Sequence, residues 1–234
     1  MINCPICKTP NHHLQTVCVS CGGFVQQKID TINLFEMIWK IIESPRKAFR
    51  SIALARNKNY VLFQGALIGY PIVGFIFWYL NVGDSAHSFA EIFVAGLFIS
   101  PFVGLIVFFL HLLFARLVIR SFGVTTKFRN LMAVVAYTSF PLILSAILIL
   151  PIELITFGMF LFTKAPNPFT LLPKSAIFLF GLDTMLGIWS LILYVISIQV
   201  LLEVKIIKSL LISLIGIGIT AITIAGLLSL IPVK

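Results

Sequence analysis

Long apolar stretches with few charged residues dominate the chain after residue 60. A transmembrane helix needs about 20 mostly apolar residues to cross a hydrocarbon core about 30 Å thick, and five stretches within residues 60–231 meet this requirement. They are residues 60–80, 92–115, 131–150, 175–202 and 209–231. The pattern predicts an all-α integral membrane protein with five transmembrane helices in a bundle.

The boundaries of the third stretch are ambiguous, because Pro141 lies near its middle and Pro151 follows it. Residues 151–162 are apolar but too short to cross a membrane alone. They either extend the third span at a tilt or lie flat at the interface. Residues 164–174 contain three prolines, which predicts a loop before the fourth span.

In residues 31–56, apolar and polar residues alternate as in an amphipathic helix, and not as in a transmembrane span. Their apolar positions recur at helical spacing: Leu34, Phe35, Ile38, Ile41 and Ile42. Asn33 or Thr31 suits the start as a cap, and the residue before Pro45 disfavours helix, so we expect an end or kink there. Trp39 beside basic residues is typical of a helix in the headgroup layer. The alternative is a juxtamembrane helix packed on the bundle.

The composition excludes a soluble globular protein, since 59% of the residues are hydrophobic and 11% are charged, against roughly 25% charged in soluble domains. The net charge of +9 does not indicate nucleic-acid binding, because most basic residues flank apolar stretches. The first 30 residues hold only Lys8 and Lys28 as basic residues, too few for a phosphate-binding face. The N-terminus has no basic segment followed by an apolar core, so we expect no secretory signal peptide.

Basic residues are distributed unequally between the two sides of the predicted spans. Fourteen of the 17 lie on the N-terminal side: Lys8, Lys28, Lys40, Arg46, Lys47, Arg50, Arg56, Lys58, Arg116, Arg120, Lys127, Arg129, Lys205 and Lys208. The other side has Lys164, Lys174 and Lys234. Because lysine and arginine mark the cytoplasmic side, we expect a cytoplasmic N-terminus and a C-terminus outside.

All four cysteines lie in the first 21 residues, as the pairs Cys4–Cys7 and Cys18–Cys21. Two Cys-x2-Cys pairs suit tetrahedral Zn²⁺, and four thiolates leave no open position for catalysis. We therefore predict a structural zinc ribbon over residues 1–27. In a reducing cytoplasm such pairs favour metal over disulfides, although a redox dithiol or free thiols are alternatives. His12 or His13 replacing one cysteine is a further alternative.

Three ionisable side chains fall within predicted spans: His111, Glu153 and Asp183. Such residues are functional candidates because burying a charge in lipid is costly, so the alternative function is a small transporter or channel component. Sequence motifs of hydrolases, metalloproteases and phosphate-binding loops are absent, and we predict no enzyme. The spacings Gly65-x3-Gly69 and Ala221-x3-Ala225 favour close helix packing, within the bundle or in a homo-oligomer.

The head resembles the short zinc ribbons at the N-termini of many prokaryotic membrane proteins, and residues 33–230 resemble the Yip family. The resemblance is carried by Trp39, Ser44-Pro45, Phe49, Phe128, Val134–Tyr137, Pro141 and Ile188-Trp189. It implies a five-span protein of a prokaryotic cytoplasmic (inner) membrane. Eukaryotic members bind Rab-type GTPases, but their Asp-Leu-Tyr-Gly-Pro type of motif is absent here. We therefore expect a non-enzymatic scaffold or adaptor with a protein partner at the cytoplasmic face.

Overall fold

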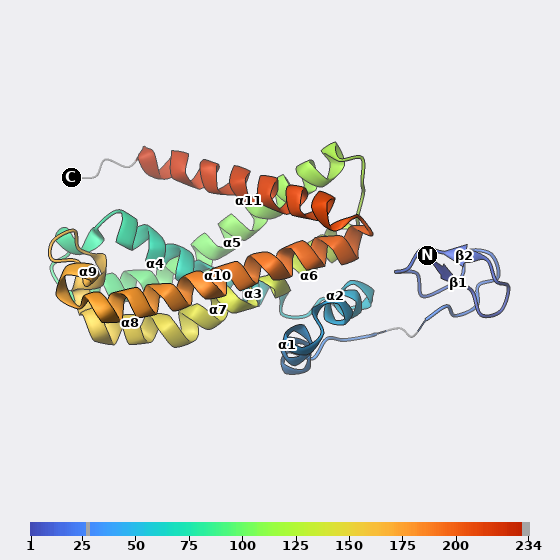
Figure 1. The fold of residues 1–234 in the computed structure, drawn as a ribbon, viewed down its shortest axis with the longest axis horizontal. Coiled ribbons are helices and arrows are strands. Elements are labelled where there is room, and N and C mark those ends of the chain that lie inside the picture. Colours follow the sequence, from blue (N-terminus) through green and yellow to red (C-terminus); the bar gives the residue numbers. More distant parts are fainter. Residues whose placement is uncertain (27–28, 231–234) are drawn as a thin grey trace.

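The computed structural model describes residues 1–26 and 29–230. It consists of an elongated helical body with a small cysteine-bearing head at one end (Figure 1). The predicted ends of the zinc ribbon at residue 27 and of the last span at residue 231 lie outside the described residues. The prediction of an all-α membrane body with a small head is confirmed by the five long apolar helices.

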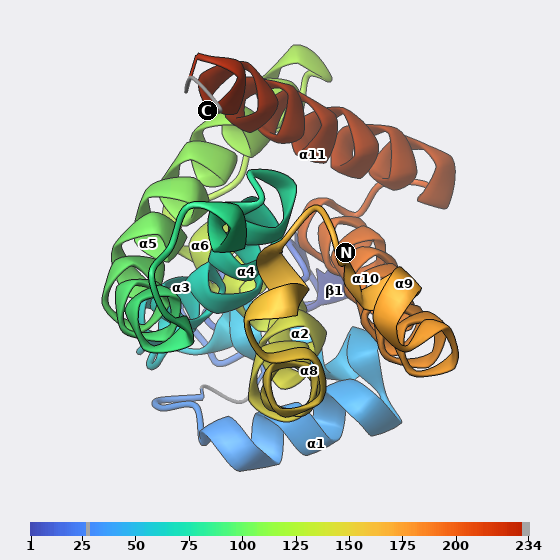
Figure 2. The same cartoon turned by 90° about the vertical axis from the view of Figure 1, so that its left-hand side faces the viewer.

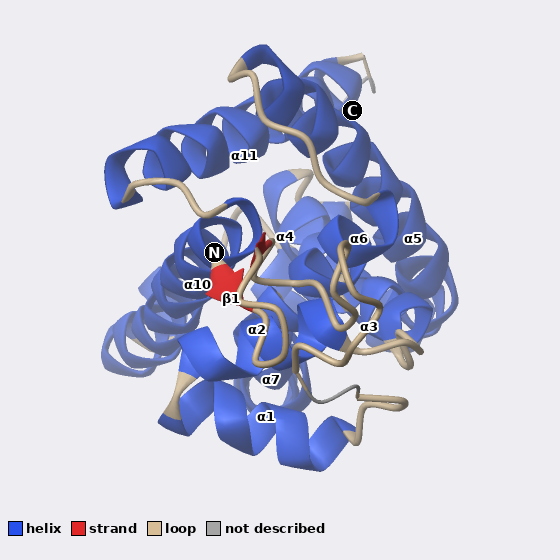
Figure 3. Cartoon of the chain, turned by 90° about the vertical axis from the view of Figure 1, so that its right-hand side faces the viewer, coloured by secondary structure: helices blue, strands red, loops and turns tan. Residues whose placement is uncertain are grey.

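The head contains two short strands, β1 (Ile2–Asn3) and β2 (Pro10–Asn11), which pair antiparallel. In the view from the head, these strands lie over the ends of the helices (Figure 3). An isolated bridge joins Val17 to Phe24. Turns and irregular segments make up the rest of the described head. Because each strand has only two residues, the strands cannot provide a hydrophobic core of their own.

The amphipathic segment forms two helices, α1 (Leu34–Glu43) and α2 (Pro45–Leu54). The Asn33 side chain caps α1 by accepting hydrogen bonds from the backbone N–H groups of Phe35 and Glu36. The break falls at Ser44 because Pro45 opens α2 at its first position, where a missing N–H costs nothing. Both helices lie beside the head-bearing end of the bundle (Figure 1).

Helices and short turns make up the body. In chain order they are α3 (Val61–Leu67), α4 (Gly69–Tyr79), η1 (Val82–Asp84), α5 (Phe89–Ser121), α6 (Phe128–Thr138), α7 (Phe140–Leu144), η2 (Ser145–Ile149), α8 (Leu150–Phe157), η3 (Gly158–Phe162), α9 (Pro168–Leu171), α10 (Pro173–Leu202) and α11 (Ile206–Ser229). The candidate spans in the described residues are 61–79, 89–121, 140–162, 173–202 and 206–229. In Figure 2, α11 lies along one side of the body, and its contacts are with α5 and α10.

The third candidate span differs from the expected residues 131–150, because it runs from Phe140 to Phe162. Helix α6 ends at Thr138 and a new helix begins with Pro141 in its first turn. The chain then stays helical through η2, a π-helix, and through α8, which carries Pro151 in its first turn. Residues 151–162 therefore continue this helical segment.

The largest fully buried side chains cluster where α2, α5, α6 and α10 meet near the head-bearing end. They include Phe49, Leu112, Leu131, Tyr137 and Ile198. By contrast, the outward faces of the spans are apolar and exposed, as at Phe102 (69%) and Ile222 (74%). Since an aqueous surface seldom carries so large an apolar area, these faces contact the lipid bilayer.

The Gly65-x3-Gly69 spacing lies at a close approach between α3, α4 and α5. A Cβ atom at Gly69 would overlap the backbone carbonyl of Ser100, and one at Gly104 would lie 2.6 Å from the Ala66 carbonyl oxygen. Only glycine fits at such a distance, so this spacing serves packing within the bundle. Ala221 and Ala225 are exposed instead.

Candidate metal centre

The four cysteine sulfurs form one compact cluster in the head. The Cys4 and Cys21 Sγ atoms are 3.6 Å apart, and the Cys7 and Cys18 Sγ atoms are 3.5 Å apart. All four Sγ atoms lie within 4.8 Å of one another. The structure thus brings together all four residues that the sequence singled out.

Two equivalent turns present these sulfurs. In the first turn, Lys8 N–H donates to the Cys4 carbonyl at 3.0 Å, and Cys4 N–H donates to the Thr9 carbonyl. In the second turn, Gly22 N–H donates to the Cys18 carbonyl at 3.1 Å, and Cys18 N–H donates to the Gly23 carbonyl. Lys8 and Gly22 follow the second cysteine of their pairs, and both have a positive φ, 59° and 71°. Lys8 therefore adopts the conformation that glycine adopts in the second turn.

The geometry of the cluster fits a tetrahedral metal. Zn–S bonds of about 2.3 Å place thiolates about 3.8 Å apart at the corners of a tetrahedron, close to the two shortest sulfur distances. Cys4 and Cys18 are buried, and Cys7 and Cys21 are exposed. The four sulfurs could hold one ion with a closed coordination shell and supply no position for water.

Hydrogen bonds to the sulfurs favour the thiolate form at two positions. Backbone N–H groups of Cys21 and Ser20 lower the pKa of Cys18 to about 6, and the Thr9 hydroxyl lowers the pKa of Cys7. The buried Asn11 side chain also donates to Cys18 Sγ at 3.5 Å. The neighbouring thiols, Cys7 first, and burial raise the pKa of Cys21 to about 12, so the donors favour the deprotonated form that a metal ligand requires at Cys18 and Cys7 and not at Cys21.

His12 and His13 do not replace a cysteine. They lie near Glu203, the residue that ends α10. His13 Nε2 is 3.0 Å from the Val200 carbonyl oxygen, and its Nδ1 is 2.5 Å from Glu203 Oε1. Burial lowers the pKa of His13, and the Glu203 carboxylate partly offsets this.

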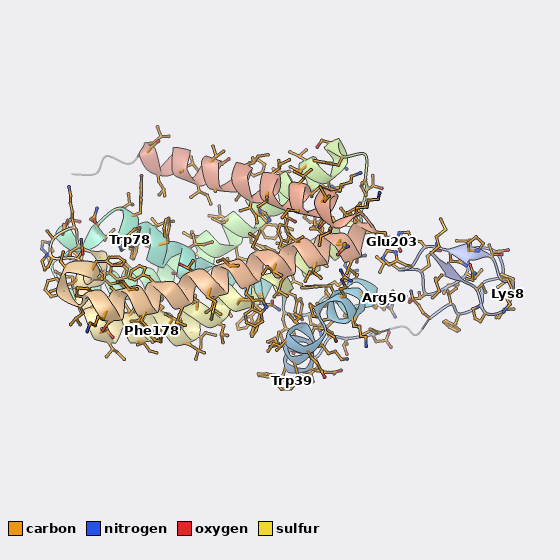
Figure 4. The ribbon with its side chains drawn as sticks, viewed as in Figure 1. Lys8, Trp39, Arg50, Trp78, Phe178 and Glu203 are labelled. Atoms are coloured by element: carbon orange, nitrogen blue, oxygen red, sulfur yellow. The ribbon has the colours of Figure 1, made fainter. Side chains whose placement is uncertain are left out.

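A second set of contacts joins the head to α2. The Gln26 side-chain amide donates to the His13 carbonyl at 2.8 Å, and Arg50 donates to Gln26 Oε1 at 3.1 Å. Arg50 and Glu203 lie where the helical body meets the head (Figure 4). The head is therefore seated on α2 and on the end of α10.

The three ionisable side chains within spans do not converge on one site. His111 is engaged at both ring nitrogens, 2.9 Å from Thr220 Oγ1 and 3.1 Å from the Tyr194 hydroxyl. Thr220 donates to the Gly216 carbonyl, so it accepts from His111 Nδ1, and Nε2 accepts from Tyr194. This satisfied network joins α5, α10 and α11.

The side chains of Glu153 in α8 and Asp183 in α10 lie next to each other. The two carboxyl groups are close enough to interact electrostatically, and Ser145 Oγ donates to Asp183 Oδ1 at 2.5 Å. Both line a cavity of about 380 Å³. The sequence identified each acid, whereas Ser145 was missed because one serine in an apolar stretch is unremarkable until folding places it beside a carboxylate.

Other functional residues also lacked a sequence pattern. Glu203 and Val200 are about 190 positions from His13 along the chain, and only the fold brings them together. Asn11 has a local indication, since it lies between the two cysteine pairs. Nothing in its spacing, however, predicts a hydrogen bond to Cys18.

Comparison with known proteins identifies a family for the helical body. The family described as the Yip1 domain matches residues 39–230. No curated protein and no solved structure matches the chain significantly. The matched residues include α2 and all five candidate spans, and they exclude the head.

Proposed function

Because the chain belongs to the Yip1 domain family, we propose that it is a non-enzymatic membrane scaffold or adaptor whose zinc-bound head docks a protein partner. The family match covers the helical body and leaves the head as an addition to it. The proposal includes a role in membrane organisation or trafficking, which membership of this family suggests. The rest of the proposal depends on what the head can bind and where it lies.

The head is proposed to hold one structural zinc ion on Cys4, Cys7, Cys18 and Cys21. The support is the close approach of the four sulfurs, which all lie within 4.8 Å of one another, and the two matching turns. A head of this size cannot bury enough apolar surface to fold alone, so metal binding would supply its folding free energy.

The proposed location is a prokaryotic inner membrane, with the head in the cytoplasm. The charge distribution supports this orientation, because fourteen of the 17 lysines and arginines belong to segments on the side of the head, and these residues mark the cytoplasmic side. In Figure 4, Lys8 and Arg50 lie toward the end opposite to Trp78 and Phe178. The four thiols would then face a reducing compartment, as a zinc site requires.

One observation carries the docking role: the head exposes large apolar side chains. Ile6, Val19 and Phe24 are 69%, 71% and 71% exposed, and Ile6 and Val19 sit between the paired cysteines of the two turns. Most of the surface of these apolar side chains is exposed, so it is available to a partner. Single exposed apolar residues are common, but three on so small a head are not.

Helix α1 adds a second apolar face at the same end. Met37 and Ile41 are buried, whereas Phe35, Trp39 and Ile42 are 82%, 67% and 52% exposed along one stripe of the helix. Trp39 lies at the outer edge of the body (Figure 4). We propose that this stripe enters the lipid headgroup layer while the opposite face packs on the bundle.

Photo-crosslinking in intact membranes tests the docking role. A crosslinking residue at Val19 is expected to give a discrete protein adduct, and this adduct should disappear when Cys4→Ser and Cys21→Ser unfold the head. A crosslinking residue at Phe169, which is exposed in α9, serves as the control and should not give that adduct. An adduct that survives the cysteine substitutions, or only lipid adducts from Val19, contradicts the proposal.

The second candidate, a small transporter or channel component, is favoured by one observation only. Glu153 and Asp183 face a cavity within the spans, whereas His111 is fully engaged by Thr220 and Tyr194. Substituted-cysteine labelling around Asp183 tests it, in a background where the native cysteines are replaced. Water access deep in α10 would favour transport over the scaffold.

A further inference from the structure

A cavity between α4, the α7–α8 segment and α10 combines acidic and apolar walls. Its volume is about 380 Å³, it is open on one side, and its polar lining is Ser145, Glu153, Asp183 and Thr184. We propose that this cavity is a binding site for a hard divalent cation, held by the carboxylates of Glu153 and Asp183 with Ser145 beside them. The site is separate from the head, so its failure would leave the adaptor proposal intact.

The first support is an unsatisfied buried acid. Glu153 is only 4% exposed, and within residues 1–26 and 29–230 its Oε1 atom has no hydrogen-bond partner. A buried polar atom without a partner costs free energy, and a carboxylate costs more. Glu153 lines the cavity, so a cation bound there would lie beside this carboxyl group.

The second support is charge balance. Two ionised carboxyl groups in contact repel each other strongly at low dielectric. The residues that line the cavity include no lysine, arginine or histidine to compensate them. One divalent cation would bring the net charge of the two carboxylates to zero, whereas a monovalent cation would leave one negative charge buried.

The donor set selects the class of metal. Carboxylate and hydroxyl oxygens suit Mg²⁺, Ca²⁺ and Mn²⁺, while the softer metals prefer sulfur and imidazole. Such cations take six or more oxygen ligands and keep several as water. A cavity of about 380 Å³ has room for a hydrated ion in addition to the side chains.

The local backbone is also unusual beside the cavity. Ser145 begins a π-helix of five residues, in which Leu150 N–H donates to the Ser145 carbonyl. Pro151 follows and has no N–H to give to the preceding turn. Such π-turns occur frequently at functional sites, and this one places the Ser145 hydroxyl 2.5 Å from Asp183 Oδ1.

The competing explanation is that the two carboxyl groups share a proton and bind no metal. A shared proton would remove the repulsion between the two carboxyl groups without a metal. It would leave one negative charge in the cavity and would give no saturable metal binding. The two explanations therefore differ in a measurable way.

Titration with Mn²⁺ tests the site in the full-length, zinc-loaded protein in lipid nanodiscs at pH 7.5. Electron paramagnetic resonance of free Mn²⁺ should show one ion bound per chain, displaced by Ca²⁺ or Mg²⁺ and not by K⁺. Glu153→Gln and Asp183→Asn should each weaken binding at least tenfold, and Ser145→Ala several-fold. Glu203→Gln, which alters the His12–His13–Glu203 cluster at the other end, is the control and should bind as before.

A measurement on the unmutated cavity covers the case in which a carboxyl variant does not fold. Trp78 lines the cavity, so bound Mn²⁺ should quench its fluorescence, and Trp78→Phe should remove the quenched fraction. Saturable quenching that depends on Trp78 supports the site. The absence of Mn²⁺ binding to the wild-type protein, or binding unchanged in folded Glu153→Gln and Asp183→Asn, overturns it in favour of a shared proton.

Discussion

At the scale of single residues, Lys8 and Gly22 form a matched pair. Both have a positive φ at the same point of their cysteine turns, a conformation that costs a side chain roughly 1 kcal/mol. Nothing lies within 4 Å of a Cβ built on Gly22, so only the backbone preference distinguishes the two residues.

We therefore expect opposite effects from exchanging these residue types. Lys8→Gly should stabilise the zinc-bound head by about 1 kcal/mol and Gly22→Ala should destabilise it by a similar amount. Competition with a zinc-binding dye measures both changes as shifts in metal affinity. Equal zinc affinities for the two variants would contradict the cost assigned to a side chain at these two positions.

His13 is the residue through which the head contacts α10. His13→Ala removes the contacts to Val200 and Glu203, each worth about 1 kcal/mol, so the head should detach from the body about 30 times more often. Proteolysis after residue 26 should be faster to that extent. His12→Ala is the control, because its ring lies exposed beside His13, and it should leave proteolysis nearly unchanged.

At the scale of helices, the contact of α4 with α5 depends on a missing side chain. Gly69→Ala would push a methyl group into the Ser100 carbonyl and should destabilise the body by about 3 kcal/mol. Gly74→Ala in the same helix is the control, since its Cβ would meet only Leu150 Cδ1 at 3.8 Å. Thermal unfolding in detergent measures both, and equal melting temperatures would contradict the close approach.

The helices also show how far the sequence predicts the fold. Five apolar stretches predicted five long helices because length and hydropathy are local properties. The third helix lies later in the chain than the expected residues 131–150. Residues 131–138 are apolar because they are buried in the protein core against α2 and α10, not because they face lipid. Hydropathy does not distinguish a core helix from a lipid-facing one, and Pro141 is compatible with a helix start or with a kink.

For the metal centre, the spacing of the cysteines was sufficient to predict which residues converge. The carboxyl pair was not predictable as a pair, because Glu153 and Asp183 are separated by a loop and by η3 and α9. The seat of the head on Val200 and Glu203 was equally hidden, since only tertiary packing joins residues so distant in the chain. Local patterns identify ligands on one turn, and non-local sites need the fold.

At the scale of the whole molecule, the head and the body depend on different stabilising forces. The body is held by helix packing in lipid, and the head by its proposed zinc ion. A strong chelator should therefore unfold the head while the five helices keep their circular dichroism and melting temperature, and it should release about one zinc per chain. Loss of the helical signal with the metal would contradict this independence.

The seat of the head has a mechanical consequence. Glu203 has a left-handed backbone (φ 52°) and joins α10 to α11, and it also contacts His13 and the N-terminal amine of Met1. A few residues of this kind absorb most of the rotation when two helices change their angle. A force applied to the head would therefore act through these contacts on the turn between α10 and α11, the last two candidate spans.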